Sequence, residues 1–459
     1  MTPSLPTIAA LAADLTARRT SSATLTDEAL ARIADPSGEG ARAFVAVDPA
    51  KARAQAAAMD LLLAQGIRLS PLHGVPVSVK DLLDVQGEVT RAGSKLLNDA
   101  PPAKADAAVV ARLRAAGAVI IGRTNMTEFA YGGIGYNPHY GTPAAPWDRK
   151  TGRVPGGSSS GAAVSVADGM AHAALGTDTG GSCRIPAAYC GVVGYKPSQP
   201  RVPRTGCFPL ADALDSIGPL ARTVADCVLV DQIIAGEAPA ALPERPLEGM
   251  RLAVPQNYVI DSLEAPVGQA FERTLKLLRD AGAKVAEVAF PVIDRMPELF
   301  VKGGIGGAEA FALHKRWLDT RAGEYDPKVA QRIEFARAQT ASEYQGLKAL
   351  RTEMIRTLAI QSQAYDALVF PATPNVPPPI ALFGDHQSMD DYTRVNGLSL
   401  RNTYVGNAFD RCSISIPCQE PGSAPVGFML MGEHGADRTL FAVAAAIEGL
   451  LDRKVRRAG

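Results

Sequence analysis

Two glycine pairs run into serines in the middle of this chain: residues 154–161 read VPGGSSSG, and residues 176–186 read GTDTGGSCRIP. The segment between them, AAVSVADGMAHAAL, is apolar and regular, whereas Gly/Ser linkers are polar throughout, which argues against a flexible linker. A phosphate-binding loop would need GxxxxGK followed by Ser or Thr, or GxGxxG after a strand, and neither pattern is present. The two stretches therefore point to a serine hydroxyl that takes part in chemistry.

Short apolar segments alternate with helical patterns on both sides of these stretches. Residues 74–82, GVPVSVKDL, are β-branched and bounded by turn residues, which predicts a buried strand that ends in Lys80. A helix is predicted over 106–117 and another strand over 118–124, and the β-α-β order returns beyond residue 250. This alternation predicts an α/β fold: a single large domain with a mixed, mostly parallel central β-sheet covered by helices on both faces.

The composition narrows the classes of partner. The 459 residues contain 47 Lys and Arg against 47 Asp and Glu, so no net field favours nucleic acid or a membrane surface. This balance favours a small, uncharged substrate. The six cysteines form no CxxC pair and the six histidines are scattered, which argues against a metal site and predicts reduced thiols in a cytoplasmic protein. Asp14 interrupts the N-terminal apolar run, so neither a signal peptide nor a membrane anchor is expected.

The sequence offers more than one way to activate a serine. Residues 157–161, GSSSG, fit the GxSxG nucleophile elbow with Ser159 as nucleophile, but that motif needs a later acid and histidine, and His172 and the histidines after it have no supporting motif. Without a histidine, a buried neutral lysine can serve as the base. Lys80 is the candidate because it closes an apolar strand, although a solvated strand end is the alternative for a lone lysine.

The stretch Pro155–Pro197, PGGSSSGAAVSVADGMAHAALGTDTGGSCRIPAAYCGVVGYKP, closely resembles the signature of the amidase signature family. The segments GVPVSVKDL, GRTNMTEFAYGGIGYNPHYGTPAAPWD and PVGFMLMG extend the resemblance over nearly the whole chain. It implies a Ser–cis-Ser–Lys triad in which Ser182 is the nucleophile, Lys80 is the base, and Ser158, joined to Gly157 by a cis peptide, relays the proton between them.

The resemblance also implies supporting roles. Arg184 either holds a substrate carboxylate or forms a structural ion pair with Asp178. Asp81 is expected to accept an orienting hydrogen bond, and Cys183 is expected to pack in the interior. The remaining implied residues are, for the oxyanion hole, the backbone N–H groups of Thr179, Gly180, Gly181 and Ser182, and, for the wall of the substrate channel, Tyr131, Gly132 and Gly133.

The implied domain organisation is a single amidase signature-type domain over residues 1–459. Residues 1–65 form an N-terminal helical segment, and residues 66–234 form the catalytic core. A linker-like loop over 235–249 follows, because this stretch is rich in Pro and Ala. Residues 250–459 are expected to complete the sheet and to supply the helices of the substrate pocket.

The implied function is that of a stand-alone serine amidase, which hydrolyses the C–N bond of small to medium amides, and also esters or carbamates, through an acyl-enzyme on Ser182. No cofactor and no metal are implied, and the expected partner is a small amide-type substrate. Two alternatives stay open: an amidotransferase subunit that takes ammonia from glutamine and passes it to a partner, and a non-catalytic member of the family. Relatives are often dimers, and no sequence feature decides whether this chain forms a homodimer.

Overall fold

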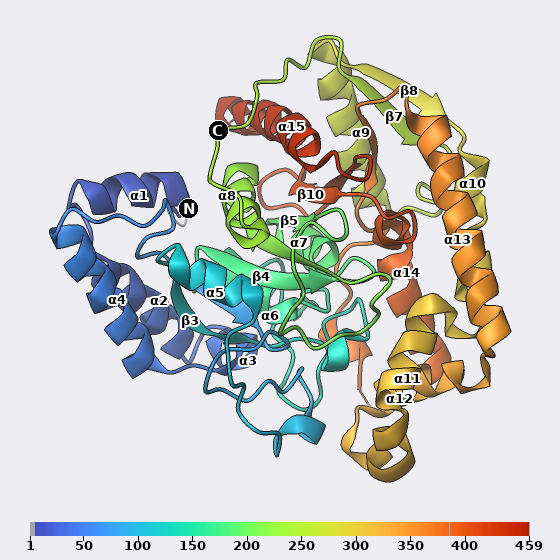
Figure 1. Ribbon diagram of the computed structural model, residues 1–459. Helices are drawn as coiled ribbons and strands as arrows, with labels where there is room; N and C mark the ends of the chain where they lie inside the picture. Colours follow the sequence, from blue (N-terminus) through green and yellow to red (C-terminus); the bar gives the residue numbers. More distant parts are fainter. Residues whose placement is uncertain (1–4, 385, 459) are drawn as a thin grey trace.

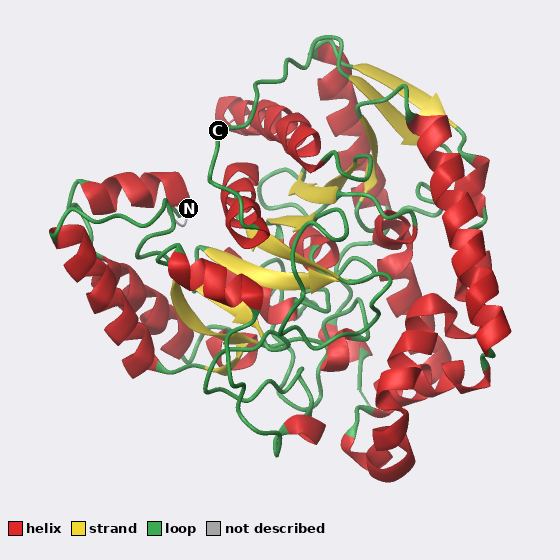
Figure 2. Ribbon diagram, in the orientation of Figure 1, coloured by secondary structure: helices red, strands yellow, loops and turns green. Residues whose placement is uncertain are grey.

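The computed structural model describes residues 5–384 and 386–458, with side chains as far as Arg453; residues 1–4 of the expected N-terminal helical segment lie outside it. Eleven strands of the described chain form one sheet, which twists through the middle of the molecule (Figures 1 and 2). The strands are β1 (Phe44–Ala46), β2 (Pro76–Lys80), β3 (Val119–Thr124), β4 (Ala173–Asp178), β5 (Val193–Lys196), β6 (Ser216–Ala221), β7 (Arg251–Pro255), β8 (Lys284–Val288), β9 (Ala367–Pro371), β10 (Ser413–Pro417) and β11 (Gly427–Met431). Their order across the sheet is β1-β3-β2-β4-β6-β5-β10-β11-β9-β7-β8.

The sheet is mixed, as the sequence predicts. Parallel pairs lie towards its two ends, where β2 pairs with β3 and β4, and β7 pairs with β8 and β9. The centre from β4 to β9 is antiparallel, and β1 adds an antiparallel edge. Parallel pairings are thus fewer than the β-α-β pattern indicates, four of ten, because β5 and β6 pair as antiparallel neighbours and the β10–β11 hairpin inserts between the two parallel parts.

Helices cover both faces of the sheet, as predicted. The α-helices are α1 (Ile8–Thr16), α2 (Ser22–Ala34), α3 (Gly40–Ala43), α4 (Pro49–Ala64), α5 (Ala108–Ala115), α6 (Ser160–Ala167), α7 (Arg184–Cys190), α8 (Val224–Ala235), α9 (Ala265–Asp280), α10 (Pro291–Asp294), α11 (Gly304–Arg321), α12 (Pro327–Glu334), α13 (Ala341–Ser362), α14 (Met389–Ala408) and α15 (Asp437–Ala458). Six short 3-10 segments, Lys95–Leu97, Glu128–Ala130, Met296–Gly303, Ala322–Glu324, Phe335–Ala338 and Ile380–Leu382, complete the helical structure of the described residues.

Neighbouring strand residues point to opposite faces, and each face has its own core. Leu175 packs in the cluster to which α5, α8, α9 and α15 contribute, whereas its neighbour Ala174 packs in the cluster of α4, α6 and α7. Strands buried on both faces explain why β2, β4 and β6 are apolar along nearly their whole length.

The parallel pair β2 and β4 fixes where polar side chains can gather. Both strands are fully buried, and Val79 of β2 lies opposite Leu175 of β4, so their carboxyl ends meet at one edge of the sheet. Lys80 ends β2, and Asp178 ends β4 immediately before the second glycine-serine stretch. That edge therefore brings the predicted lysine and the predicted nucleophile together.

Helices from the later half of the chain lie on the side of the sheet where β2 and β4 end. The helices expected for the substrate pocket include α11, α12 and α13, on the right of Figure 1. Asp326 caps α12 through its side chain, which accepts a hydrogen bond from the Lys328 amide, and Pro327 follows at the first helical position. Residues 236–250 contain neither helix nor strand, yet the strands on both sides of them join the same sheet, since β5 pairs with β10.

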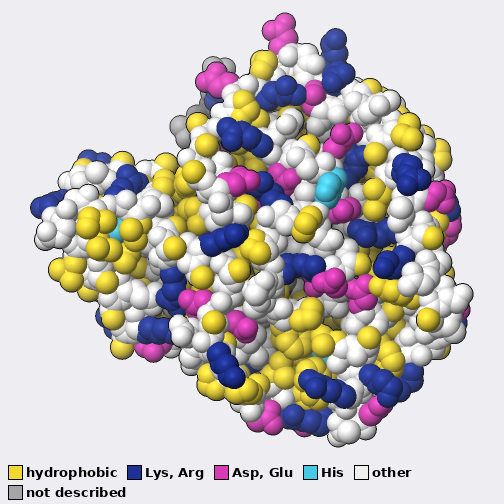
Figure 3. Space-filling model, viewed as in Figure 1, with side chains coloured by type: hydrophobic (Ala, Val, Ile, Leu, Met, Phe, Trp, Pro, Cys, Tyr) yellow, Lys and Arg dark blue, Asp and Glu magenta, His cyan; other side chains and the backbone are white. Residues whose placement is uncertain are grey.

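Positive and negative side chains are interspersed on the face shown in Figure 3, in keeping with the equal numbers of acidic and basic residues. Among the helices of residues 5–384 and 386–458, none combines the length and the apolarity that crossing a membrane requires.

Candidate active site

Lys80 lies in the interior of the molecule, at the end of the fully buried strand β2. Its Nζ is 2.7 Å from Ser158 Oγ and 2.8 Å from Thr177 Oγ1. Burial lowers the pKa of Lys80 from 10.5 to about 8, because the charged amine is removed from water, and the carboxylates of Asp178 and Asp215 offset only part of this effect. The Lys80 amine can therefore be neutral, and so accept a proton, at mildly alkaline pH.

Ser158 is fully buried next to this amine, just before α6. The Gly157–Ser158 peptide is cis, as the family resemblance implies. The Ser158 carbonyl accepts a hydrogen bond from the Thr127 amide at 3.1 Å, and the following amide, of Ser159, donates to the Ser182 carbonyl at 3.3 Å. The second of these bonds holds the first serine stretch against the second.

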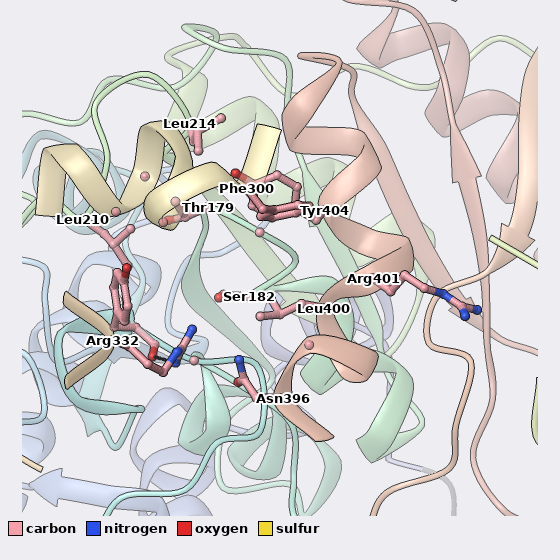
Figure 4. Close-up of a pocket in the computed structure, with 18 of the residues that line it drawn as sticks. Thr179, Ser182, Leu210, Leu214, Phe300, Arg332, Asn396, Leu400, Arg401 and Tyr404 are labelled. Atoms are coloured by element: carbon pink, nitrogen blue, oxygen red, sulfur yellow. Dashed lines mark hydrogen bonds between the residues drawn. The ribbon is translucent and has the colours of Figure 1, made fainter. Parts of the chain in front are cut away.

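Ser182 lies in the turn between β4 and α7 and lines a cavity of about 320 Å³ (Figure 4). Gly181, directly before Ser182, has to be glycine, because its φ is 130° and a Cβ there would lie 2.0 Å from Thr403 Oγ1. The lining residues are Ala130, Tyr131, Gly132, Thr179, Gly180, Ser182, Leu210, Leu214, Tyr258, Phe300, Gly303, Gly306, Gly307, Arg332, Thr393, Asn396, Gly397, Leu400, Arg401 and Tyr404.

Backbone amides surround Ser182, but they are not equivalent. Among the described residues, no acceptor pairs with the amides of Thr179, Gly180 and Ser182, and all three residues line the cavity. The Gly181 amide instead donates to the Asp178 carboxylate at 2.9 Å, and Gly181 does not line the cavity. Three of the four expected oxyanion donors thus belong to residues that line the cavity and are unpaired within the described chain, whereas the fourth stabilises the turn.

The Asp178 carboxylate is the centre of a buried network beneath that turn. It accepts hydrogen bonds from the Cys183 amide, from Nε and Nη2 of Arg184, and from Nδ2 of Asn407. Burial alone would raise the pKa of Asp178, but Arg184 and Asn407 outweigh it and hold the pKa at about 2. The network ties the end of β4 to α7 and to α14.

Arg184 does not reach the cavity. Its guanidinium is fully buried, pairs with Asp178 at 2.8 Å and donates to the Thr403 carbonyl and to Asn407 Oδ1. The structure therefore places it in the structural ion pair, and not against a substrate carboxylate, because its donors are already engaged inside the protein.

The expected channel residues divide in the same way. Tyr131 and Gly132 line the cavity, but Gly133 does not; its amide donates to Oδ1 of Asn396, a lining residue, at 2.8 Å. Asp81 is an acceptor, as expected, although it serves Arg123 and the Gly93 amide and not Lys80.

Ser159, the nucleophile of the elbow alternative, lies outside the cavity. Its hydroxyl donates to the Thr177 carbonyl at 3.3 Å, and no histidine lines the cavity in the described part of the chain. His172 contacts Arg222 and His314 contacts Tyr325, so both have structural partners. Cys183 is buried and its thiol donates to the Gly218 carbonyl, which agrees with a packing role.

Several site residues carry no signal in the sequence. Thr177, which holds the Lys80 amine, is an ordinary residue of a buried strand. Arg332 and Asn396 come from α12 and α14, far along the chain from both serine stretches. Their place at the cavity becomes visible only once the fold brings α12 and α14 next to Ser182.

The arrangement has the parts of a nucleophilic site. It holds a buried amine that can lose its proton near pH 8, a hydroxyl in contact with it, a second hydroxyl on a cavity wall and three unpaired amides around that second hydroxyl. Such a set can form and stabilise a tetrahedral intermediate on a carbonyl group.

Comparisons with known proteins agree with this chemistry. The profile of the Amidase family matches residues 24–441. The 2-amino-5-chloromuconic acid deaminase of Comamonas testosteroni is 38% identical over 415 residues, which cover 89% of this chain and 88% of that protein. A glutamyl-tRNA(Gln) amidotransferase subunit of Roseiflexus sp. (strain RS-1) is 36% identical, over 94% of this chain and 93% of that protein. A crystal structure of an amidase superposes with a TM-score of 0.87 at 32% identity, over 97% of this chain and 99% of that one.

Proposed function

This chain belongs to the amidase signature family and is an amidase acting on C–N bonds, and we propose that Ser182, Ser158 and Lys80 are its catalytic residues. The observation that carries the proposal is the contact of 2.7 Å between the buried Lys80 amine and the Ser158 hydroxyl, next to Ser159, whose amide donates to the carbonyl of Ser182 on the cavity wall. A lysine that is buried in this way, hydrogen-bonded to two hydroxyls, has no need of water to stabilise its neutral form.

The proposed reaction starts with neutral Lys80. Lys80 takes the proton of the Ser158 hydroxyl while Ser158 takes that of Ser182, and Ser182 Oγ attacks the amide carbon. The amides of Thr179, Gly180 and Ser182 donate to the oxyanion that forms. The C–N bond then breaks, the proton returns through Ser158 to the leaving nitrogen, and water hydrolyses the acyl ester on Ser182.

We propose water, and not a partner's substrate, as the final acceptor. Glutamine carries an α-ammonium group, which a buried site would bind with a carboxylate, and within residues 5–384 and 386–458 no Asp or Glu lines the cavity. This favours a stand-alone hydrolase over the ammonia-delivering role that the similarity to the amidotransferase protein of Roseiflexus would allow. Esters and carbamates, whose carbonyl groups can occupy the same position, extend the proposed range of substrates.

The proposed setting is the cytoplasm, because all six cysteines are unpaired in the structure. The proposed partner is a small amide-type molecule, in keeping with a cavity of about 320 Å³. A homodimer is the proposed assembly, and its test is the mass of the purified protein in solution.

Mutation of the serines tests the catalytic assignment. With a panel of 4-nitroanilides, Ser182→Ala and Ser158→Ala are expected to lower kcat by a factor of about 10³ or more, since each removes one member of a unit that acts together. Ser159→Ala, the matched control in the same stretch, is expected to retain turnover. Mass spectrometry of the quenched reaction is expected to find the acyl group on Ser182. Turnover that persists in Ser182→Ala would overturn the proposal.

A further inference from the structure

The cavity wall carries positive charge without a matching negative charge. Among the described residues that line it are two arginines, Arg332 and Arg401, and none of them is Asp or Glu. The net charge of the whole chain is zero, so this is a local property that composition does not reveal. A site of one sign, enclosed by low-dielectric walls, attracts a ligand of the opposite sign.

Arg332 presents its guanidinium to the cavity. Nη1 donates to the Tyr131 carbonyl at 2.5 Å, and the group lies over the Tyr131 ring at 4.8 Å from its centre and near the Tyr392 ring at 5.9 Å. These contacts fix its position, but in residues 5–384 and 386–458 no carboxylate forms an ion pair with it. Its charge is therefore held in place and not neutralised by the protein.

Asn396 adds a second donor beside it. The residue is 2% exposed and belongs to α14, and its Oδ1 accepts a hydrogen bond from the Gly133 amide. That bond orients the side chain so that the Nδ2 hydrogens remain for the cavity, and no acceptor among the described residues takes them. Figure 4 shows Arg332 and Asn396 on one side of the cavity, with their nitrogens directed towards the space in front of Ser182.

Arg401 is different. It lines the cavity with its aliphatic stem, and in Figure 4 its guanidinium points away from Ser182. Its Nε donates to Asn402 Oδ1 at 3.0 Å. Arg401 is thus a comparison residue of the same type on the same wall.

We propose that Arg332 and Asn396 form a carboxylate subsite, so that the substrates of this enzyme are amides that carry a free carboxylate. The planar guanidinium and the amide N–H group together offer donors to both oxygens of a carboxylate. Leu210, Leu214 and Phe300 supply an apolar wall for the body of such a molecule. The inference rests on the proposed function, since it places the carboxylate at one end of the cavity and the scissile amide at Ser182.

Matched pairs of substrates test the subsite. The mono-4-nitroanilide of glutaric acid and its methyl ester differ in the negative charge, as do 3-acetamidobenzoic acid and its methyl ester, which place the charge on the leaving side. The acid is expected to be the better substrate in at least one pair. Arg332→Gln is expected to lower kcat/KM for that acid by roughly 10- to 100-fold, mainly through KM, the range for charge-assisted hydrogen bonds. The ester is expected to change by less than about threefold.

The ratio within a pair separates binding from damage to the fold, because a displaced Tyr131 would slow acid and ester alike. Arg401→Gln is expected to leave the acid-to-ester ratio unchanged. An acid-to-ester ratio that is the same in Arg332→Gln and the parent protein would overturn the proposal.

Calorimetry with the Ser182→Ala protein gives a readout that needs no turnover. It is expected to bind the preferred acid more tightly than its ester, and the additional Arg332→Gln change is expected to remove that preference. Equal binding of acid and ester in both pairs would overturn the subsite, while Ser182-dependent hydrolysis of the esters would leave the proposed function standing. Preferential binding of an acid with no hydrolysis in the parent protein would support the subsite and contradict the proposed function.

Discussion

Two buried lysines, Lys80 and Lys196, differ in the groups that their amines contact. Burial lowers the pKa of each to about 8. Lys80 contacts two hydroxyl groups, of Ser158 and Thr177, whereas Lys196 donates to the carbonyls of Pro197 and Arg411. A hydroxyl can give up a proton to a neutral amine and a carbonyl cannot, so only Lys80 is placed to act as a base.

The pH dependence of the reaction should follow Lys80. Below pH 8 the amine is protonated and cannot accept the Ser158 proton, so kcat/KM is expected to fall about tenfold for each pH unit, and to level off above about pH 9. The measurement is kcat/KM for a neutral 4-nitroanilide between pH 6 and pH 10, at values where the protein stays folded.

Lys196→Met is the matched control, because it removes the other group that titrates near pH 8. The midpoint of the profile is expected to remain in this variant, and Lys80→Ala is expected to lose activity at every pH. A midpoint that disappears with Lys196, or a flat profile in the parent protein, would contradict the assignment of Lys80 as base.

At the scale of single elements, the turn between β4 and α7 is held from beneath by Asp178, and from the side by α14 through Asn407 and Thr403. The Thr403 hydroxyl donates to the Gly180 carbonyl at 2.8 Å, and Thr179 Oγ1 donates to Asp215 at 2.6 Å. The Gly180 carbonyl and the Thr179 hydroxyl are thus held in place, while the amides of Thr179, Gly180 and Ser182 have no partner in the described part of the chain. Buried polar partners keep the donors in place before a substrate arrives.

Removing Arg184 should cost stability and not substrate selectivity. Arg184→Met leaves the Asp178 carboxylate buried without its main partner, and the free energy of unfolding at pH 7 is expected to fall by about 3–5 kcal/mol. Denaturant unfolding monitored by fluorescence and circular dichroism measures this loss.

The sign of the pH effect adds a second check on the same variant. Without Arg184 the pKa of Asp178 is no longer held down, so burial raises it above the unfolded value and the lost stability is regained as pH falls through that raised pKa. The double variant Arg184→Met/Asp178→Asn is expected to recover part of the stability at pH 7. An Arg184→Met protein that unfolds like the parent but fails selectively on carboxylated amides would show that Arg184 binds substrate after all.

The sequence predicts an element well where only one kind of structure explains its pattern of residues. The apolar run that ends in Lys80 means a strand buried on both faces, and the structure agrees. Pairing direction was predicted less well, because a β-α-β pattern does not reveal that β6 returns antiparallel beside β4. The proposed triad residues follow from the family signature, but Arg332 and Asn396 do not, since local periodicity does not show which side of α12 or α14 meets a cavity.

At the scale of the whole molecule, the cavity lies between two stretches of chain that are joined by residues 236–250. Ser182 and Thr179 come from before this connection, and Arg332 and Asn396 come from after it. The sheet joins these two stretches through the pairing of β5 with β10. Asn407 and Thr403 join them as well, through their hydrogen bonds to the turn between β4 and α7 that carries Ser182. The connection itself runs outside the sheet, and Pro243 and Glu244 within it are exposed.

The connection should therefore tolerate lengthening. Ten Gly/Ser residues inserted between Pro243 and Glu244 are expected to change the free energy of unfolding by less than about 1 kcal/mol, because closure entropy rises only slowly with loop length. Unfolding is expected to remain a single transition, and kcat is expected to stay within about twofold of the parent value. The same insertion between Gly191 and Val192, where α7 turns directly into β5, is the matched control and is expected to abolish activity. If the Pro243 insertion instead splits unfolding into two transitions, the chain is two units that the connection holds together, and not one body united by its sheet.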